Sequence, residues 1–135
     1  KINVLIGANG AGKTNFVDLF RLLRAMADEG LQTFILDQGT ADGLFFLGPK
    51  RTPLISCHLE FGSNEYDFAL APTGGGSVQV KQETVRYTGG KGLGKPEILS
   101  SGSLESALKR SKDEPSYWTK GRGVSSYVYE AVSDW

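Results

Sequence analysis

Nine residues near the start of the chain, GANGAGKTN from Gly7 to Asn15, have the types and spacing of a phosphate-binding loop. They match the pattern G-x-x-x-x-G-K-S/T at every fixed position. Gly7, Gly10 and Gly12 let the backbone curl because no Cβ atom is in the way, so successive N–H groups can point at phosphate oxygens. The pattern therefore predicts a cradle for the phosphates of a nucleotide, helped by the N-terminal end of the following helix.

Two side chains of this loop carry its chemistry. The ammonium group of Lys13 is expected to reach the β- and γ-phosphates, which makes Lys13 the candidate catalytic residue. The hydroxyl of Thr14 is expected to ligate Mg²⁺. The predicted phosphate-binding set is Gly7, Ala8, Asn9, Gly10, Ala11, Gly12, Lys13 and Thr14.

The nucleotide is expected to be ATP rather than GTP. A GTPase should carry an N-K-x-D element that recognises guanine. None of the asparagines is followed by lysine; they are Asn3, Asn9, Asn15 and Asn64.

A strand and a helix must flank such a loop, and the sequence predicts both. The apolar run from Ile2 to Ile6 enters the glycine turn and indicates a buried strand. From Lys13 to Glu29 apolar residues recur at helical spacing, and Gly30 is placed to end this helix. The expected apolar stripe comprises Phe16, Leu19, Phe20, Leu22, Leu23, Met26 and Ala27. The segment that follows, from Leu31 to Asp37, is expected to be a strand or an extended connection.

The apolar period then changes to two, which predicts an antiparallel meander. Residues 55–61 and 65–71 alternate around the turn GSN, and 78–87 form a third strand after the turn PTGGGS. The apolar phase shifts within that strand, so a bulge or an end is expected near Glu83. Cys57 is expected to pack in the core, and His58 to face solvent on the polar side of its strand.

The last third of the chain predicts loops and helices. Residues 88–103 read as a loop, after which Ser103 could cap a short helix that Pro115 closes. An amphipathic helix is expected at the C-terminal end, with apolar residues at helical spacing: Val124, Tyr127, Val128, Ala131, Val132 and Trp135.

These elements predict an α/β fold in which a nucleotide-binding core adjoins an antiparallel sheet and C-terminal helices. We expect one partial domain made of residues 1–50, 51–88 and 89–135, which carry the loop and its helix, the meander, and the helical segment respectively. The chain begins at Lys1 and its one methionine is Met26, so a piece of a longer protein is expected.

The composition of the chain limits the binding partners and the compartment that can be expected. Fifteen basic and fifteen acidic residues give a net charge of zero, so the overall charge provides no electrostatic footprint for DNA or for a membrane surface. One cysteine excludes an intrachain disulfide framework and suits the reducing cytoplasm, where we expect the protein to act. No apolar run approaches the length that spans a bilayer.

Two other segments allow a functional or an ordinary interpretation. TFILD, from Thr33 to Asp37, is either a Walker B strand whose aspartate holds Mg²⁺ or an ordinary segment that ends in aspartate. LSSGS, from Leu99 to Ser103, is either similar to the LSGGQ signature of ABC-type ATPases or a Ser/Gly loop that caps a helix. No second acid follows Asp37, and no apolar strand ending in Asp-Glu follows LSSGS, so the ordinary interpretation is favoured for both.

The opening INVLIGANGAGKTNFVDLF resembles that of the SMC/RecF-like branch of ABC ATPases, which includes predicted AAA-family ATPases. The resemblance rests on Asn9, on GAGKTN and on the apolar-acidic start of the helix, and the meander is similar to the β-subdomain of the first lobe of these proteins. It implies that Asn15 adds a contact near the α-phosphate. It also makes Gln38 and Gln82 the nearest candidates for the Q-loop glutamine, and places the remaining motifs beyond Trp135.

In that family two ATP molecules are sandwiched between two heads, so the resemblance implies a head-to-head homodimer or a partner ATPase head. It implies ATP hydrolysis by the full-length protein, in DNA repair, chromosome maintenance or defence, with negligible turnover by these residues alone. Two alternatives stay open. One is a module in which ATP drives assembly without hydrolysis, and the other is a P-loop kinase that uses Asp37.

Overall fold

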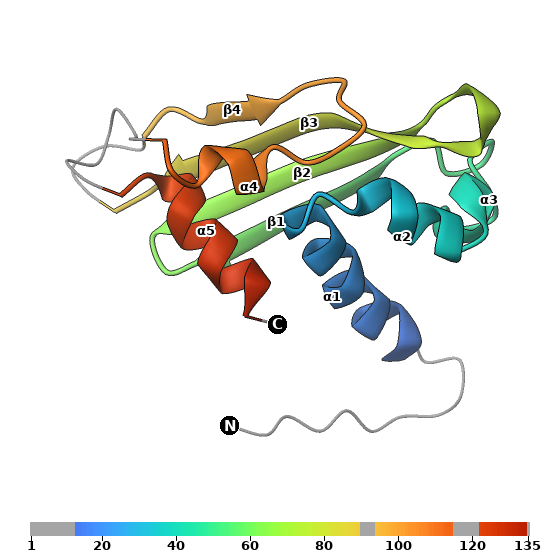
Figure 1. The fold of residues 1–135 in the computed structure, drawn as a ribbon, viewed down its shortest axis with the longest axis horizontal. Helices are drawn as coiled ribbons and strands as arrows, with labels where there is room; N and C mark the ends of the chain where they lie inside the picture. Colours follow the sequence, from blue (N-terminus) through green and yellow to red (C-terminus); the bar gives the residue numbers. More distant parts are fainter. Residues whose placement is uncertain (1–12, 90–93, 115–121, 135) are drawn as a thin grey trace.

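The computed structural model describes residues 13–89, 94–114 and 122–134. Within these ranges the strands form one antiparallel four-stranded sheet in the order β1-β2-β3-β4 (Figure 1). The strands are β1 (Ile55–Phe61), β2 (Asn64–Pro72), β3 (Val78–Tyr87) and β4 (Glu97–Ser100). The predicted meander is confirmed, including the turn between β1 and β2 and the alternation of covered and exposed residues along β1.

A bulge in β3 changes which residues face the core. Ala69 pairs with Gln82, whereas Leu70 pairs with Val80, so Lys81 is the extra residue. Against β4 the register shifts again between Glu83 and Thr84. The bulge expected near Glu83 is therefore confirmed. A bulge of one residue exchanges the inward-facing and outward-facing positions that follow it, so the side chain of Glu83 faces the interior.

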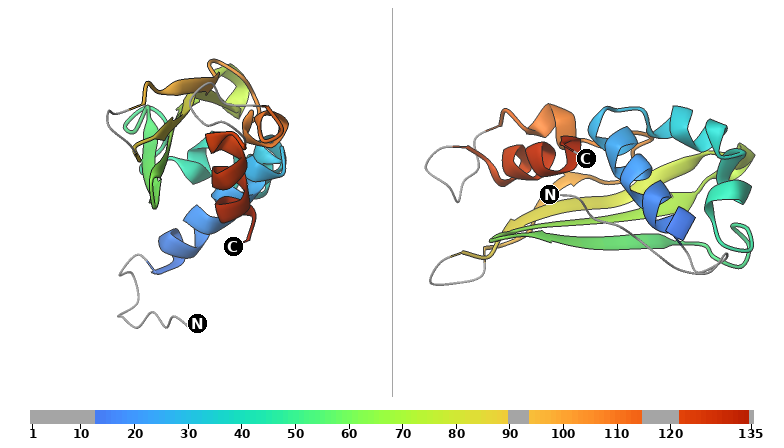
Figure 2. Two further views of the ribbon diagram at one scale, coloured as in Figure 1. Left: turned by 90° about the vertical axis from the view of Figure 1, so that its left-hand side faces the viewer. Right: turned by 90° about the horizontal axis from the view of Figure 1, so that it is seen from below.

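The helices are α1 (Lys13–Ala27), α2 (Leu31–Asp37), α3 (Thr40–Leu44), α4 (Leu108–Ser111) and α5 (Val124–Ser133). Helices α1, α2, α4 and α5 lie on one face of this sheet, and α3 lies at its end beside the connection between β2 and β3 (Figures 1 and 2). The core between the two layers is apolar and is contributed mainly by Leu22, Leu23, Met26, Leu31, Ile35, Tyr66, Phe68, Leu70, Val78, Val80, Val85, Val128 and Val132.

The cap at the C-terminal end of helix α1 is centred on Glu29, one residue before the predicted Gly30. The Glu29 N–H donates to the Met26 carbonyl at 3.3 Å and the Gly30 N–H donates to the Ala25 carbonyl at 2.8 Å, which is the Schellman arrangement. Glu29, with φ of 60°, takes the left-handed conformation, whereas Gly30 has φ of −115°. Gly30 therefore takes part in the predicted cap through its N–H, but Glu29 provides the left-handed residue.

The expectation of a strand or extended connection at Leu31–Asp37 is wrong, because this segment is helix α2. Leu31 and Ile35, four residues apart, both face the core. The carboxylate of Glu105 accepts hydrogen bonds from the Leu31 N–H at 2.8 Å and the Gln32 N–H at 3.1 Å. A residue distant in sequence thus caps the helix, and no local pattern could have revealed it.

The loop predicted over 88–103 contains a fourth strand, β4. Ser103 does not cap a helix, because its hydroxyl donates to the Glu105 carbonyl at 2.6 Å and its carbonyl accepts from the Val80 N–H at 2.7 Å. Helix α4 begins later, at Leu108. Pro115, expected to close this helix, lies outside the described residues.

Helix α5 confirms the predicted amphipathic pattern at its core positions. Val124, Val128 and Val132 are buried, whereas Tyr127 from the same predicted stripe is 47% exposed. Trp135 lies outside the described residues. None of the helices in the described ranges combines the length and the hydropathy that a membrane-spanning segment requires.

Candidate functional site

The described part of the predicted phosphate site is the first turn of α1. The expected strand at residues 2–6, the loop residues 7–12 and the side chain of Lys13 lie outside what the structure describes. Helix α1 begins at Lys13, directly after the loop, and Thr14 and Asn15 are exposed. No acidic residue lies in its first turn, so no carboxylate there opposes the partial positive charge of the helix N-terminus. The first turn of α1 therefore carries no negative charge that would repel an anion.

The other end of α1 is held firmly. Leu23 and Met26 are fully buried, and the guanidinium of Arg24 binds the Asp28 carboxylate at 2.7 Å and the carbonyl oxygen of Ser133 at the end of α5. The N-terminal end of the helix projects toward the margin of the molecule (Figure 2), and Phe16 there is 47% exposed rather than buried as its place in the predicted stripe suggested. The helix therefore presents its first turn from an anchored base.

A pocket of about 330 Å³ opens beside this first turn. It lies between α1, α2, α3 and the start of β1, and its lining residues are Asn15, Asp18, Leu19, Leu22, Phe34, Gln38, Gly43, Leu44, Phe46 and Ile55. The structure thereby brings Gln38, a Q-loop candidate, into one pocket with Asn15, a predicted site residue. Gln82, the other candidate, is exposed on β3 and lines a different hollow.

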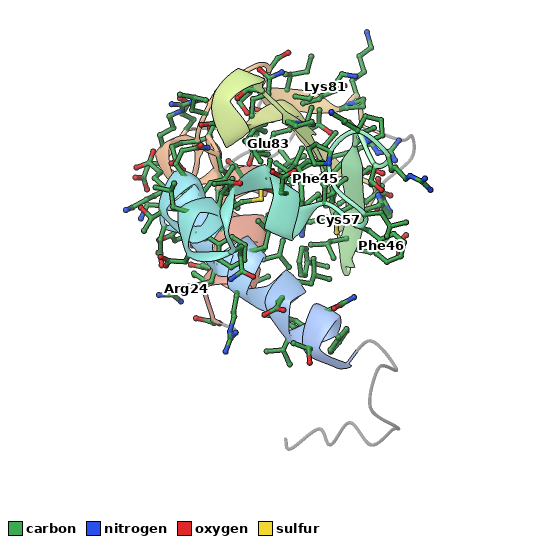
Figure 3. All side chains as sticks on the ribbon, turned by 90° about the vertical axis from the view of Figure 1, so that its right-hand side faces the viewer. Arg24, Phe45, Phe46, Cys57, Lys81 and Glu83 are labelled. Carbon is green, nitrogen blue, oxygen red and sulfur yellow. The ribbon has the colours of Figure 1, made fainter. Side chains whose placement is uncertain are left out.

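Sequence reasoning missed the aromatic walls of this pocket, Phe34 and Phe46. Phe34 and Gln38 are four residues apart, so a helical interpretation of this segment would have placed them on one side. Phe46 follows Phe45 in a connection whose course depends on tertiary contacts. Phe45 is buried in the interior, whereas Phe46 lies at the margin near β1 and is 75% exposed (Figure 3).

A close approach of two backbones shapes the pocket between α2 and α3. A Cβ atom at Gly43 would lie 1.8 Å from the carbonyl oxygen of Gln38. Only glycine permits this contact, and both residues line the pocket. The narrow turn between the helices therefore sets the position of Gln38.

Neither TFILD nor LSSGS supplies the ATPase motif that it resembles, although Phe34 of TFILD lines the pocket. Asp37 ends helix α2 rather than a strand, so its interpretation as a Walker B aspartate is wrong. Leu99 and Ser100 belong to β4, and Gly102, with φ of 71°, forms the turn after it. Because α4 begins only at Leu108, LSSGS does not open a helix as the ABC signature would.

A second hollow, of about 500 Å³, lies on the outer face of the sheet and is lined in part by His58 and Asp67. His58 Nδ1 lies 2.7 Å from Asp67 Oδ1, and its Nε2 lies 3.3 Å from Glu60 Oε1. The hydrogen bond to Asp67, and then that to Glu60, raises the pKa of His58. The exposed position expected for His58 is confirmed.

His58, Glu65 and Asp67 offer ligand atoms within 4.8 Å of one another and are the group in the described ranges that could hold a metal ion. Each is already engaged, however. Glu65 binds the guanidinium of Arg86, with Nε 2.6 Å from its carboxylate, and His58 binds two carboxylates. The cluster is therefore accounted for as a cross-strand network of ion pairs. It lies apart from Thr14, the predicted Mg²⁺ ligand.

Glu83 is a fully buried carboxylate whose oxygens accept four hydrogen bonds. Oε1 accepts from the hydroxyls of Tyr66 and Ser106, and Oε2 accepts from the Ser100 hydroxyl and the Ala107 N–H, at 2.6–2.9 Å. Burial, and then the charge of Glu83, raises the pKa of Tyr66 well above its ordinary value. The alternation of Val85 and Tyr87, extended backwards, would have placed Glu83 on the inner face.

A family model described as "AAA domain, putative AbiEii toxin, Type IV TA system" matches residues 2–117 of the chain. The match includes the loop from Gly7 to Asn15, helix α1 and the whole sheet, and it ends before α5. No curated protein and no solved structure matches the chain.

Proposed function

Since the chain belongs to this family of AAA-domain P-loop ATPases, we propose that it binds ATP with Mg²⁺ through the loop from Gly7 to Asn15. In this proposal the backbone N–H groups of the loop hold the phosphates, and Asn15 adds a contact near the α-phosphate. Lys13 neutralises charge on the β- and γ-phosphates, and Thr14 ligates Mg²⁺. ATP and Mg²⁺ are the ligands that the family implies.

One observation carries the proposal: the complete loop motif runs directly into the exposed first turn of a well-anchored helix. Phosphate binding at a helix start requires free N–H groups and an approach for the anion. The absence of acidic residues from the first turn of α1 and the exposure of Thr14 meet the second requirement.

We further propose that the full-length protein hydrolyses ATP in the manner of an SMC/RecF-like head, with the ATP held between two heads of a homodimer or a partner ATPase. The description of the family names a toxin of a type IV toxin–antitoxin system, which favours defence over DNA repair or chromosome maintenance. The kinase alternative loses its support because Asp37 ends a helix. Single-turnover hydrolysis by the full-length protein decides between an ATPase and a module that only assembles on ATP.

Replacement of Lys13 by alanine tests the proposal. A charge-assisted hydrogen bond contributes about 1.5–3 kcal/mol, so Lys13→Ala is expected to weaken MgATP binding by about tenfold or more. Equilibrium titration with ATP in the presence of Mg²⁺ measures this. Lys50→Ala removes an exposed lysine outside the loop and should leave the affinity unchanged. Equal affinities of the Lys13 variant and the unsubstituted protein would show that the loop is not the phosphate site.

A further inference from the structure

The pocket between α1, α2 and α3 lies beside the first turn of α1, where the phosphates are proposed to bind. We propose that it receives the adenine ring of the ATP whose phosphates lie at the first turn of α1, with Phe46 stacking on the ring and Gln38 contacting its edge. This inference rests on the proposed function, because it needs the phosphates at the loop.

The position of the pocket is the first argument. Asn15 lines it and directly follows Thr14, the last residue of the phosphate-binding motif. In ATP the base is joined through the ribose to the α-phosphate, the phosphate that Asn15 is proposed to approach. The base therefore has to lie near Asn15, and the pocket opens there. Its volume of about 330 Å³ is within the range of small-ligand pockets.

The aromatic rim is the second argument. Phe46 is 75% exposed although its neighbour Phe45 is 2% exposed, so the connection holds one ring inside and presents the other. The Thr52 hydroxyl donates to the Phe46 carbonyl at 2.5 Å and fixes the backbone at this point. A phenyl ring held at the mouth of a pocket is a suitable platform for a planar base.

The polar wall is the third argument. Gln38 lines the pocket, and its side-chain amide makes no hydrogen bond to another of the residues that the structure describes. A glutamine amide carries a donor and an acceptor side by side, which match N7 and the N6 amino group of adenine. Guanine presents two acceptors at the same edge. The pocket therefore favours ATP over GTP.

The test compares MgATP with inorganic tripolyphosphate in Mg²⁺, because tripolyphosphate keeps the phosphates and lacks the base. Phe46→Ala is expected to weaken ATP binding roughly fivefold or more, since stacking on an aromatic ring contributes about this much per base. Its tripolyphosphate affinity should stay unchanged. Gln38→Ala should bring the ratio of the ATP affinity to the GTP affinity closer to one. Because Phe46 is exposed, its replacement should leave the fold intact, which a thermal melt verifies.

Leu36→Ala is the matched control, because Leu36 is 70% exposed on α2 and does not line the pocket. If Phe46→Ala left the ATP affinity unchanged, or lowered the affinities for ATP and tripolyphosphate equally, the proposal that this pocket binds adenine would be wrong. Such a result would leave the phosphate site standing, provided that Lys13→Ala still loses both ligands. If the unsubstituted protein bound neither ATP nor tripolyphosphate, the proposed function itself would fail.

Discussion

At the outer face of the sheet, the imidazole of His58 is shared between two carboxylates. Asp67, its direct partner across the β1–β2 pair, holds Nδ1, and Glu60, two residues along the same strand, holds Nε2. Both contacts favour the charged ring, so the pKa of His58 lies above its ordinary value. These hydrogen bonds account for the cluster without any ligand, because they pair the polar side chains on the outer face of β1 and β2.

Replacement of Asp67 by asparagine should lower the pKa of His58, because it removes the hydrogen bond that raises this pKa most. The folded pKa is raised, so the stabilisation from charged His58 is fully present below the unfolded pKa of about 6.5. It is lost as pH rises through the folded value. Titration of the His58 ring protons by NMR measures the shift, with Ser56→Ala on the same strand as the control. An unchanged midpoint in Asp67→Asn would show that Asp67 does not set the pKa.

At the scale of elements, Glu83 joins parts of the fold that are distant in sequence. Its carboxylate lies on β3 and accepts hydrogen bonds from Tyr66 of β2, Ser100 of β4 and the segment that leads into α4. Glu105, in that same segment, caps α2. The segment that leads into α4 is thereby bonded to the sheet through Glu83 and to helix α2, which borders the pocket, through Glu105.

Glu83→Ala is expected to destabilise the protein by about 3–5 kcal/mol, because it leaves several buried donors without an acceptor. Tyr66→Phe removes one donor only and should cost about 1 kcal/mol. Urea denaturation measures both. Gln82→Ala changes the exposed neighbour and should stay within about 0.5 kcal/mol of the unsubstituted protein. A Glu83→Ala variant as stable as Gln82→Ala would contradict the role assigned to this carboxylate.

The sequence predicts the elements whose patterns are local. The alternation in β1 and β2, the bulge in β3 and the apolar face of α5 all follow from side-chain periodicity. Helix α2 could not be predicted, because TFILD is rich in β-favouring residues and its cap, Glu105, lies far along the chain. The exposure of Phe16 likewise depends on which half of α1 finds neighbours. The loop motif can be recognised from the sequence alone, whereas the pocket beside the first turn of α1 depends on the packing of three helices.

In the molecule as a whole, a layer of helices packs on one face of a four-stranded sheet, and the N-terminal end of helix α1 projects from this layer (Figure 2). Helix α1 contacts α5 and α2 through its buried half, while its first turn lies at the margin (Figure 2). The buried half of α1 thus anchors the helix start at which we propose that the phosphates of ATP bind. The family match spans the same unit, from the loop through the sheet.

In the proposed function the phosphates of ATP bind the backbone N–H groups from Gly7 to Asn15. Backbone amide chemical shifts, followed by NMR during titration with MgATP, locate the residues that bind the nucleotide. The largest shifts are expected within residues 7–15, with smaller shifts at the pocket residues Gln38 and Phe46. Saturating shifts confined to other parts of the chain, or no shifts at millimolar ATP, would contradict the proposed function.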